Sequence, residues 1–353
     1  SAEGARRIAD RLFAEGPGGS ASATSPKAIA GPSRVVAPGS AGGAEQPPYS
    51  AVVTMLYILL WYMFSAGYNI FFKRSFADFP FPWASALFQM ALGIPIFGAQ
   101  WLLRLRKTPR LTAAEAGRLL PAAAANLLTQ IGAVIAFCGS AVSFVHIVKA
   151  SEPVASSVLN YLFVGEVLSW PVYAALVPII GGVALASVKE LSFTWFSFAC
   201  AMSSNIGSAL RSVYSKKVQR SYSMGESMNQ ENLYSVLTIM SVVMLLPIAI
   251  YMEPVSTIVQ GLGAAHAVGG RAFWLNMLAS GICFYFYNEL AFTVLGRMDP
   301  VSHAVANTMK RVFVIIVAIL VLRNPVTPLG AVGSLVALAG TLAYARASAR
   351  RKA

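Results

Sequence analysis

Hydrophobic runs of about twenty residues recur from Tyr49 onward and constrain the fold more than any other feature of the chain. An α-helix needs about 20 apolar residues to cross the hydrocarbon core of a bilayer. With 56% hydrophobic and 12% charged residues, the 353-residue chain is too apolar for a soluble domain. The sequence therefore predicts an all-α, multi-pass membrane protein with ten transmembrane helices, near residues 50–72, 82–103, 117–138, 141–164, 169–188, 192–214, 232–251, 272–296, 300–322 and 327–347.

Two stretches of the chain, residues 142–187 and 301–345, resemble each other. Lys149 corresponds to Lys310 and Gly182 to Gly340, with one small gap between them. The offset equals five helices, and an odd number of helices places the two copies in opposite orientations across the membrane. This pattern predicts two inverted five-helix repeats, residues 49–188 and 189–348. The alternative is chance similarity between apolar helices.

The ends of the chain differ in composition from the repeats. Residues 1–48 are rich in Ala, Gly, Ser and Pro, which predicts a disordered tail, and residues 349–353 form a short basic tail. Within the first tail, residues 5–14 have the pattern of a basic amphipathic helix. We interpret this segment as the remnant of an organelle-targeting signal or, alternatively, as part of an unstructured tail.

Four basic side chains, Lys149, Arg211, Lys310 and Arg311, lie within apolar runs. Each costs roughly 2.5 to 3.5 kcal/mol at mid-membrane depth if nothing compensates it. Glu152 and Glu289 can neutralise two of the four, which leaves an excess of about two positive charges. Lys supplies point charge and Arg supplies forked hydrogen bonds, a combination that suits phosphate. The sequence therefore predicts a cavity for a dianionic phosphate group; the alternative is a purely structural charge network.

Helical spacing places further polar residues on the same faces as these cations. His303 and Asn307 share a face with Lys310 and Arg311, and Ser204 and Ser208 share one with Arg211. The third and eighth predicted helices add Asn126, Gln130, Tyr287 and Asn288. Polar faces from both halves of the chain can therefore meet at one central cavity.

Several other classes of function lack support in the sequence. The formal net charge of +13 is divided among loops, the chain end and the predicted spans, so it forms no single basic face for nucleic acid. The three cysteines stand singly and without metal-ligand spacing. Because no nucleophile and base pair or phosphate-cradling glycine loop is found either, we expect no enzyme activity, no metal and no cofactor.

Five motifs, AVSFVHIVKASEP, VALASVKELSFTW, LRSVYSKKV, FYNELAF and SHAVANTMKRVFVI, occur in this order between about residues 50 and 347. They resemble those of the plastid phosphate translocators, the triose-phosphate and phosphoenolpyruvate exchangers of the drug/metabolite transporter superfamily. The resemblance implies that Lys149, Lys310 and Arg311 hold the phosphate group. It also implies that Arg211 and Tyr287 contact the organic end of the substrate, with Lys149 contributing to both.

The third predicted helix departs from the triose-phosphate pattern, because Gln130 and Ala133 stand where such exchangers typically carry His and Thr or Ser. We therefore expect these two residues to line a substrate pocket of mixed three-carbon specificity. The resemblance implies an antiporter that exchanges inorganic phosphate for triose phosphate, 3-phosphoglycerate or phosphoenolpyruvate across a plastid-type membrane. The alternatives are a hexose- or pentose-phosphate translocator, a nucleotide-sugar transporter of Golgi or endoplasmic reticulum membranes and, outside these carriers, an anion channel.

Overall fold

The computed structural model describes residues 51–350, except residues 166, 189, 222–226, 299 and 324–326. The predicted N-terminal tail and residues 351–353 lie outside the described residues. Within the described part the fold is all-α, without strands. Its helices are α2 (Ala51–Asp78), α3 (Pro82–Ala91), α4 (Gly93–Leu102), α5 (Ala113–Gly139), α6 (Val142–Lys149), α7 (Glu152–Val164), α8 (Trp170–Val188), α9 (Trp195–Ser221), α10 (Gln230–Met252), α11 (Val255–Arg297), α12 (Pro300–Leu322) and α13 (Pro328–Arg350).

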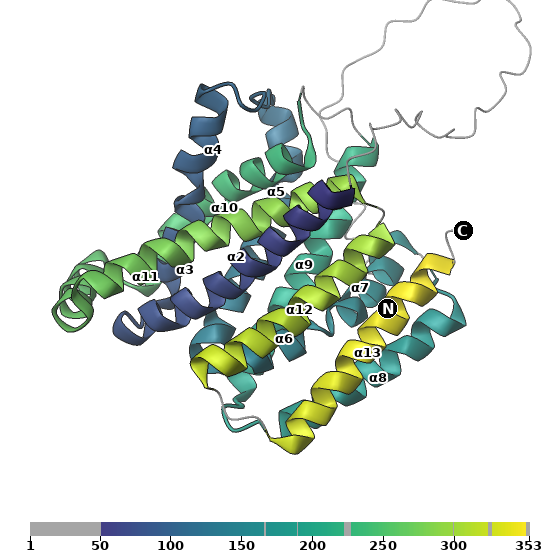
Figure 1. The fold of residues 1–353 in the computed structure, drawn as a ribbon. Coiled ribbons are helices and arrows are strands. Elements are labelled where there is room, and N and C mark those ends of the chain that lie inside the picture. Colours follow the sequence, from purple (N-terminus) through teal and green to yellow (C-terminus); the bar gives the residue numbers. More distant parts are fainter. Residues whose placement is uncertain are drawn as a thin grey trace, which may run out of the picture.

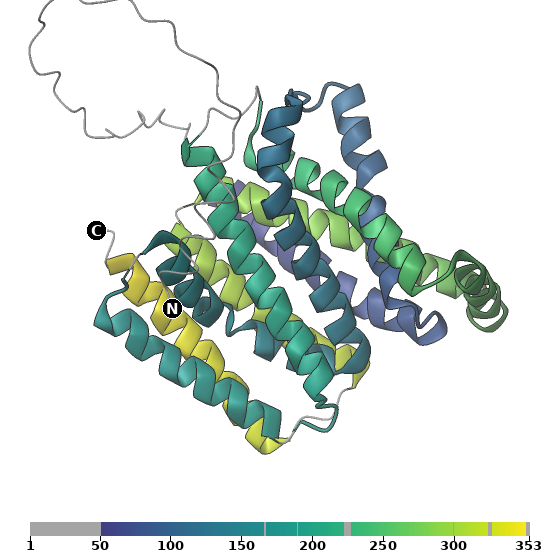
Figure 2. The same cartoon turned by 180° about the vertical axis from the view of Figure 1, so that it is seen from behind.

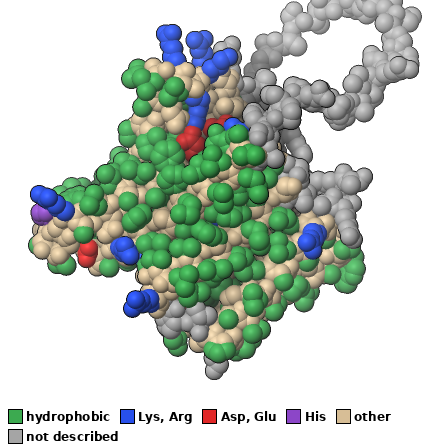
Figure 3. Space-filling view, in the orientation of Figure 1, with side chains coloured by type: hydrophobic (Ala, Val, Ile, Leu, Met, Phe, Trp, Pro, Cys, Tyr) green, Lys and Arg blue, Asp and Glu red, His purple; other side chains and the backbone are tan. Residues whose placement is uncertain are grey.

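Among the described residues, eight helical segments are long and apolar enough to cross a membrane. They are residues 52–78, 82–102, 113–139, 170–188, 230–252, 255–297, 302–322 and 328–348. Helices α6 and α7 are individually too short, with 8 and 13 residues. On the face shown in Figure 3, hydrophobic side chains cover most of the surface and Lys and Arg lie mainly toward its edges. These features identify the chain as a multi-pass helical membrane protein.

The predicted fourth span is not one continuous helix. It divides into α6, which ends at Lys149, and α7, which begins at Glu152 with Pro153 in its first turn; Ala150 and Ser151 lie between them. Proline suits the first turn of a helix, where its missing N–H leaves no hydrogen bond unmade. The break lies between Lys149 and Glu152, so it sets the relative positions of two charged residues.

The segment before the predicted eighth span is helical rather than a loop. Helix α11 begins at Val255 and runs to Arg297, with a kink at Gly270, where φ is +51° and ψ is −133°. A residue with a side chain rarely adopts this conformation, so glycine is the suitable residue at the kink. Figure 1 shows the short part before the kink at one end of the long α11 helix.

Three pairs of helices pack along much of their length: α2 with α11, α5 with α9, and α8 with α13. The α8 and α13 pair is seen at one edge of the bundle in Figure 1, and the α5 and α9 pair is seen from behind in Figure 2. Gly207 allows the close approach of α9 to α5, since a Cβ there would lie 2.7 Å from Thr129 N and 2.8 Å from Ala125 O. Small residues favour such helix contacts in membranes.

Candidate functional site

The four intramembrane cations meet around the break between α6 and α7. Lys149 ends α6, Arg211 lies on α9, and Lys310 and Arg311 lie on α12. Glu152, the first residue of α7, interacts electrostatically with all four of them. The tertiary structure thus brings together the four basic residues that the sequence singled out.

Glu152 and Arg311 form the central ion pair of this cation cluster. Arg311 Nη2 donates to Glu152 Oε2 at 2.6 Å, and Ser208 Oγ donates to Glu152 Oε1 at 2.5 Å. Arg311 is only 6% exposed, and its Nη1 is a buried donor for which the described residues provide no hydrogen-bond partner. Because buried donors are rarely left unpaired, this nitrogen is available to donate to an additional acceptor.

Neutral polar residues hold the next two cations. Lys149 Nζ donates to Ser204 Oγ at 2.6 Å, and Ser204 in turn donates to the Thr129 carbonyl oxygen at 2.7 Å. Arg211 Nη1 donates to Asn126 Oδ1 at 3.3 Å. These contacts position the two cations without neutralising their charge.

Lys310 lies against aromatic rings instead of a carboxylate. Its Nζ is 4.6 Å from the ring centroid of Trp61 and 5.8 Å from that of Tyr287. Trp61 is 1% exposed and stacks on His303, with ring centroids 5.3 Å apart. Trp61 is a site residue that the sequence does not reveal, because a tryptophan within an apolar span carries no signal that it faces a lysine.

Glu289 does not neutralise the cation cluster, contrary to the expectation that it would pair with one of the four cations. Its carboxylate forms an ion pair with Arg106, which belongs to the connection between α4 and α5. Among the described residues, Glu152 is then the carboxylate that remains for the four cations. The excess of positive charge is therefore about three rather than two.

The two residues at which the sequence departs from the triose-phosphate pattern are buried on α5. Gln130 is 6% exposed and Ala133 is 9% exposed, and Ala133 packs in the main apolar cluster of the bundle. Gln130 follows Thr129, whose carbonyl accepts the hydrogen bond from Ser204, and lies one turn after Asn126, which holds Arg211. Their contact with substrate stays a prediction.

The histidine side chains in the described part of the chain have partners within the protein. No cluster of three or more His, Cys, Asp or Glu side chains that could hold a metal ion occurs there. His146 is buried beside Asn69, with 3.2 Å between His146 Nε2 and Asn69 Oδ1. His303 Nε2 lies 3.3 Å from the Ala291 carbonyl oxygen. Both histidines are thus hydrogen-bonded inside the bundle.

The fold and the site together define a multi-pass helical membrane protein with an excess of buried positive charge at its centre. The chain belongs to the Triose-phosphate Transporter family, whose model matches residues 52–345.

Relatives within this family carry several substrate names. The chain is 37% identical over 289 residues to phosphoenolpyruvate/phosphate translocator 3, chloroplastic, of Oryza sativa subsp. japonica, covering 82% of this chain and 73% of the relative. It is 35% identical to the triose phosphate/phosphate translocator, non-green plastid, chloroplastic, of Brassica oleracea var. botrytis, covering 82% and 72%. It is 36% identical to the xylulose 5-phosphate/phosphate translocator, chloroplastic, of Arabidopsis thaliana, covering 88% and 74%.

A solved crystal structure of another protein shares the fold. The two superimpose with a TM-score of 0.52 over 85% of this chain and 97% of the other, at 15% sequence identity. At this level of identity the likeness concerns the fold alone.

Proposed function

We propose that this protein is an antiporter that exchanges inorganic phosphate for phosphorylated three-carbon metabolites across a plastid-type membrane. The observation that carries the proposal is the cation cluster, in which four basic side chains share one carboxylate and Arg311 Nη1 lacks a partner among the described residues. A bound phosphate dianion would offset most of the remaining charge. The relatives support the phosphate-exchange part of this proposal, because they are named as chloroplastic translocators of phosphate and phosphorylated metabolites.

We assign the phosphate group to Lys149, Lys310 and Arg311. Lys310 and Arg311 are adjacent on α12, and Lys149 ends α6, which packs against α12. We assign the organic end of the substrate to Arg211 and Tyr287, with Gln130 and Ala133 nearby on α5. The electrostatic interaction between Arg211 and Tyr287, and the hydrogen bond that ties Arg211 to Asn126 on α5, support this grouping.

We also propose that the bundle consists of ten spans in two inverted repeats. The first repeat comprises α2, α3 with α4, α5, α6 with α7, and α8; the second comprises α9, α10, the part of α11 after Gly270, α12 and α13. In these repeats α2 corresponds to α9, α5 to α11, and α8 to α13. A two-fold rotation that interchanges the repeats therefore places the α2 and α11 pair on the α9 and α5 pair. It places the α8 and α13 pair on itself. The observed packing of these three pairs is consistent with such a two-fold relation and supports the proposal.

Strict exchange follows from the charge of the proposed site. If the empty site closes, three positive charges without a carboxylate are removed from water, whereas a bound phosphate compensates them. We expect purified protein in liposomes to take up labelled phosphate at least about tenfold faster when the vesicles contain phosphate than when they contain none. Equal uptake by loaded and unloaded vesicles would favour an anion channel.

The substrate class is tested by the same assay with a panel of internal substrates. We expect triose phosphate, 3-phosphoglycerate and phosphoenolpyruvate to support exchange better than glucose 6-phosphate, xylulose 5-phosphate or nucleotide sugars. A stronger response to a five- or six-carbon phosphate would replace the three-carbon assignment with the pentose- or hexose-phosphate alternative. A stronger response to nucleotide sugars would instead place the protein with the nucleotide-sugar transporters.

Gln130 gives a prediction about selectivity. An uncharged amide can donate and accept hydrogen bonds, so it accommodates both phosphoenolpyruvate and triose phosphate. We expect Gln130→His to shift the ratio of the two exchange rates toward triose phosphate by about threefold to tenfold. Gln130→Leu, the matched control without hydrogen bonds, should slow exchange of both substrates. An unchanged ratio in Gln130→His would remove Gln130 from the proposed substrate pocket.

A further inference from the structure

An apolar cavity lies on the other side of the break that carries Lys149 and Glu152. It has a volume of about 500 Å³, within the usual range of ligand-binding pockets. Its lining residues come from α7, α8, α9 and the connections before α7 and α9: Ser151, Val154, Ile180, Val183, Ala184, Ser187, Val188, Phe193, Trp195, Phe198 and Met202.

The hydroxyl groups in the cavity already have partners within the protein. Ser151 Oγ lies 2.7 Å from the Val148 carbonyl oxygen and 3.4 Å from Met202 Sδ, and Ser187 Oγ donates to the Val183 carbonyl oxygen at 2.7 Å. The remaining lining is hydrocarbon, aromatic or thioether. An occupant of this cavity therefore needs apolar surface rather than hydrogen-bonding groups.

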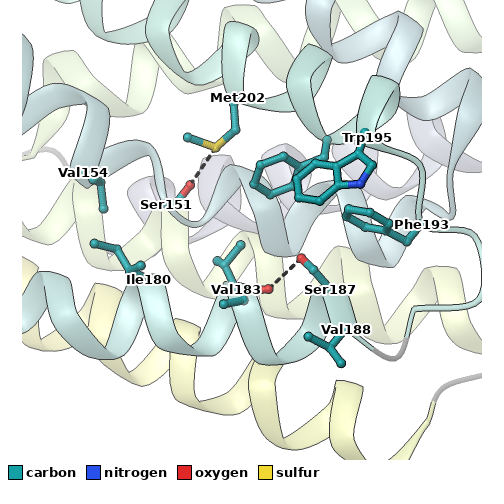
Figure 4. Close-up of a pocket in the computed structure, with 11 residues that line it drawn as sticks. Ser151, Val154, Ile180, Val183, Ser187, Val188, Phe193, Trp195 and Met202 are labelled. Carbon is teal, nitrogen blue, oxygen red and sulfur yellow. Dashed lines mark hydrogen bonds between the residues drawn. The ribbon is translucent and has the colours of Figure 1, made fainter.

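The cavity opens onto the apolar outer surface of the bundle. Ile180 and Val188 on α8 and Trp195 at the start of α9 are exposed, with Trp195 at 77%. In Figure 4, Phe193 and Trp195 lie at one end of the cavity, and Ser151 and Val154 lie toward the other. Tryptophan is enriched where membrane proteins meet the bilayer interface, so the aromatic end fits the entrance for a chain that comes from the bilayer.

We propose that this cavity binds one acyl chain of a bilayer phospholipid. The surrounding bilayer supplies acyl chains at the cavity mouth, and an acyl chain entering from it would gain dispersion contacts that an empty cavity forfeits. Inside, the chain would reach Ser151, one of the two residues between the proposed phosphate ligand Lys149 and Glu152. Asn205 Nδ2 donates to the Val148 carbonyl oxygen at 3.0 Å and to Ser151 Oγ at 3.2 Å, which ties the same break to α9.

The acyl chain would thus pack against the break between α6 and α7 on the side opposite the cation cluster. In an exchanger the substrate site opens alternately to the two sides of the membrane. If α6 and α7 move during this change, an acyl chain in the cavity would alter the rate at which they move. This second part rests on the proposed function. The lipid site itself does not, so the two are tested separately.

The lipid site is tested by photolabelling purified protein in phosphatidylcholine vesicles that contain a phosphatidylcholine with a diazirine in its acyl chain. We expect the label on Met202 and on residues 151–154. Ala184→Phe fills the cavity from α8 and should lower this labelling by about fivefold. The matched control is Ala174→Phe, an exposed position on the same helix outside the cavity, which should leave the labelling unchanged.

Val188→Trp at the exposed mouth provides a second variant with little risk to folding, and it too should reduce the labelling of Met202. Labelling confined to Ile180, Val188 and Trp195 in the wild-type protein would overturn the proposal, because it would show contact with bulk lipid only. Stronger labelling of Met202 by a photoreactive free fatty acid than by phosphatidylcholine would also overturn it.

Once the wild-type protein has been shown to exchange phosphate, exchange by Ala184→Phe and Ala174→Phe tests whether occupancy of the cavity affects transport. We expect Ala184→Phe to change the turnover number by about threefold or more while KM for phosphate stays near that of Ala174→Phe, because the cavity does not touch the phosphate ligands. Equal turnover by the two variants would overturn the link, whereas the photolabelling result would stand on its own.

Discussion

Lys310→Ala is expected to lower phosphate exchange by about a hundredfold while the protein still folds and inserts. Truncating one partner of a buried, hydrogen-bonded charge pair costs about 2 to 5 kcal/mol, and in our proposal that partner is the substrate phosphate. Lys310 lies on the rings of Trp61 and Tyr287 and forms no ion pair with a described carboxylate. Its removal therefore leaves no acid unpaired. Exchange in liposomes and thermal unfolding of the purified variant are the measurements.

Arg311→Ala should lower phosphate exchange to a similar extent, but it also leaves Glu152 without its ion-pair partner. The double variant Arg311→Ala with Glu152→Ala removes one charge of each sign, so it separates loss of the phosphate ligand from damage to the fold. Arg346→Ala on α13 is the control for loss of an exposed positive charge. Near-normal exchange by both Lys310→Ala and the double variant would refute the assigned phosphate site.

Glu152→Gln is expected to slow exchange at least about tenfold while lowering KM for phosphate. The carboxylate is the one negative charge that the described structure places within the cation cluster, where it bonds to Arg311 and Ser208. Opposite charges 4 Å apart interact by about 4 kcal/mol at an effective dielectric constant of 20, so removing this charge strengthens the hold of the remaining cations on phosphate. Tighter binding slows the release on which each exchange cycle depends.

The measurement is KM and turnover number for phosphate exchange, with Glu152→Asp as the control that keeps the charge. We expect the turnover of Glu152→Asp to lie closer to that of the wild-type protein. If Glu152→Gln exchanges phosphate at the wild-type rate with an unchanged KM, Glu152 does not balance the substrate charge. The ion pair with Arg311 would then be structural.

The class of protein could be predicted from the sequence because hydropathy is a local property. Each apolar run predicts a helix by itself, and a basic residue within such a run can be recognised from the local sequence alone. Lys149, Arg211, Lys310 and Arg311 were all recognisable in this way. The family motifs around them pointed to the same four residues, and the family model matches the same region of the chain.

The break in the fourth span was less visible. VKASEPV contains only one proline, and the surrounding residues are apolar enough for a continuous helix. Within a continuous helix, Lys149 and Glu152 would be neighbours at i and i+3. In the structure a new helix starts at Glu152, so its carboxylate turns to Arg311 and Lys149 donates to Ser204 instead.

Only the tertiary structure decided which charges are compensated. Glu152 meets Arg311 across 159 residues of sequence, Glu289 is bound by Arg106 across 183 residues, and Trp61 lies under Lys310 from the opposite end of the chain. Such contacts depend on how each helix is rotated and where helices cross, which the composition of a single span does not determine. The sequence by itself thus determined that positive charge is buried in this membrane protein, and the packing of distant helices decided how much of it is left for a ligand.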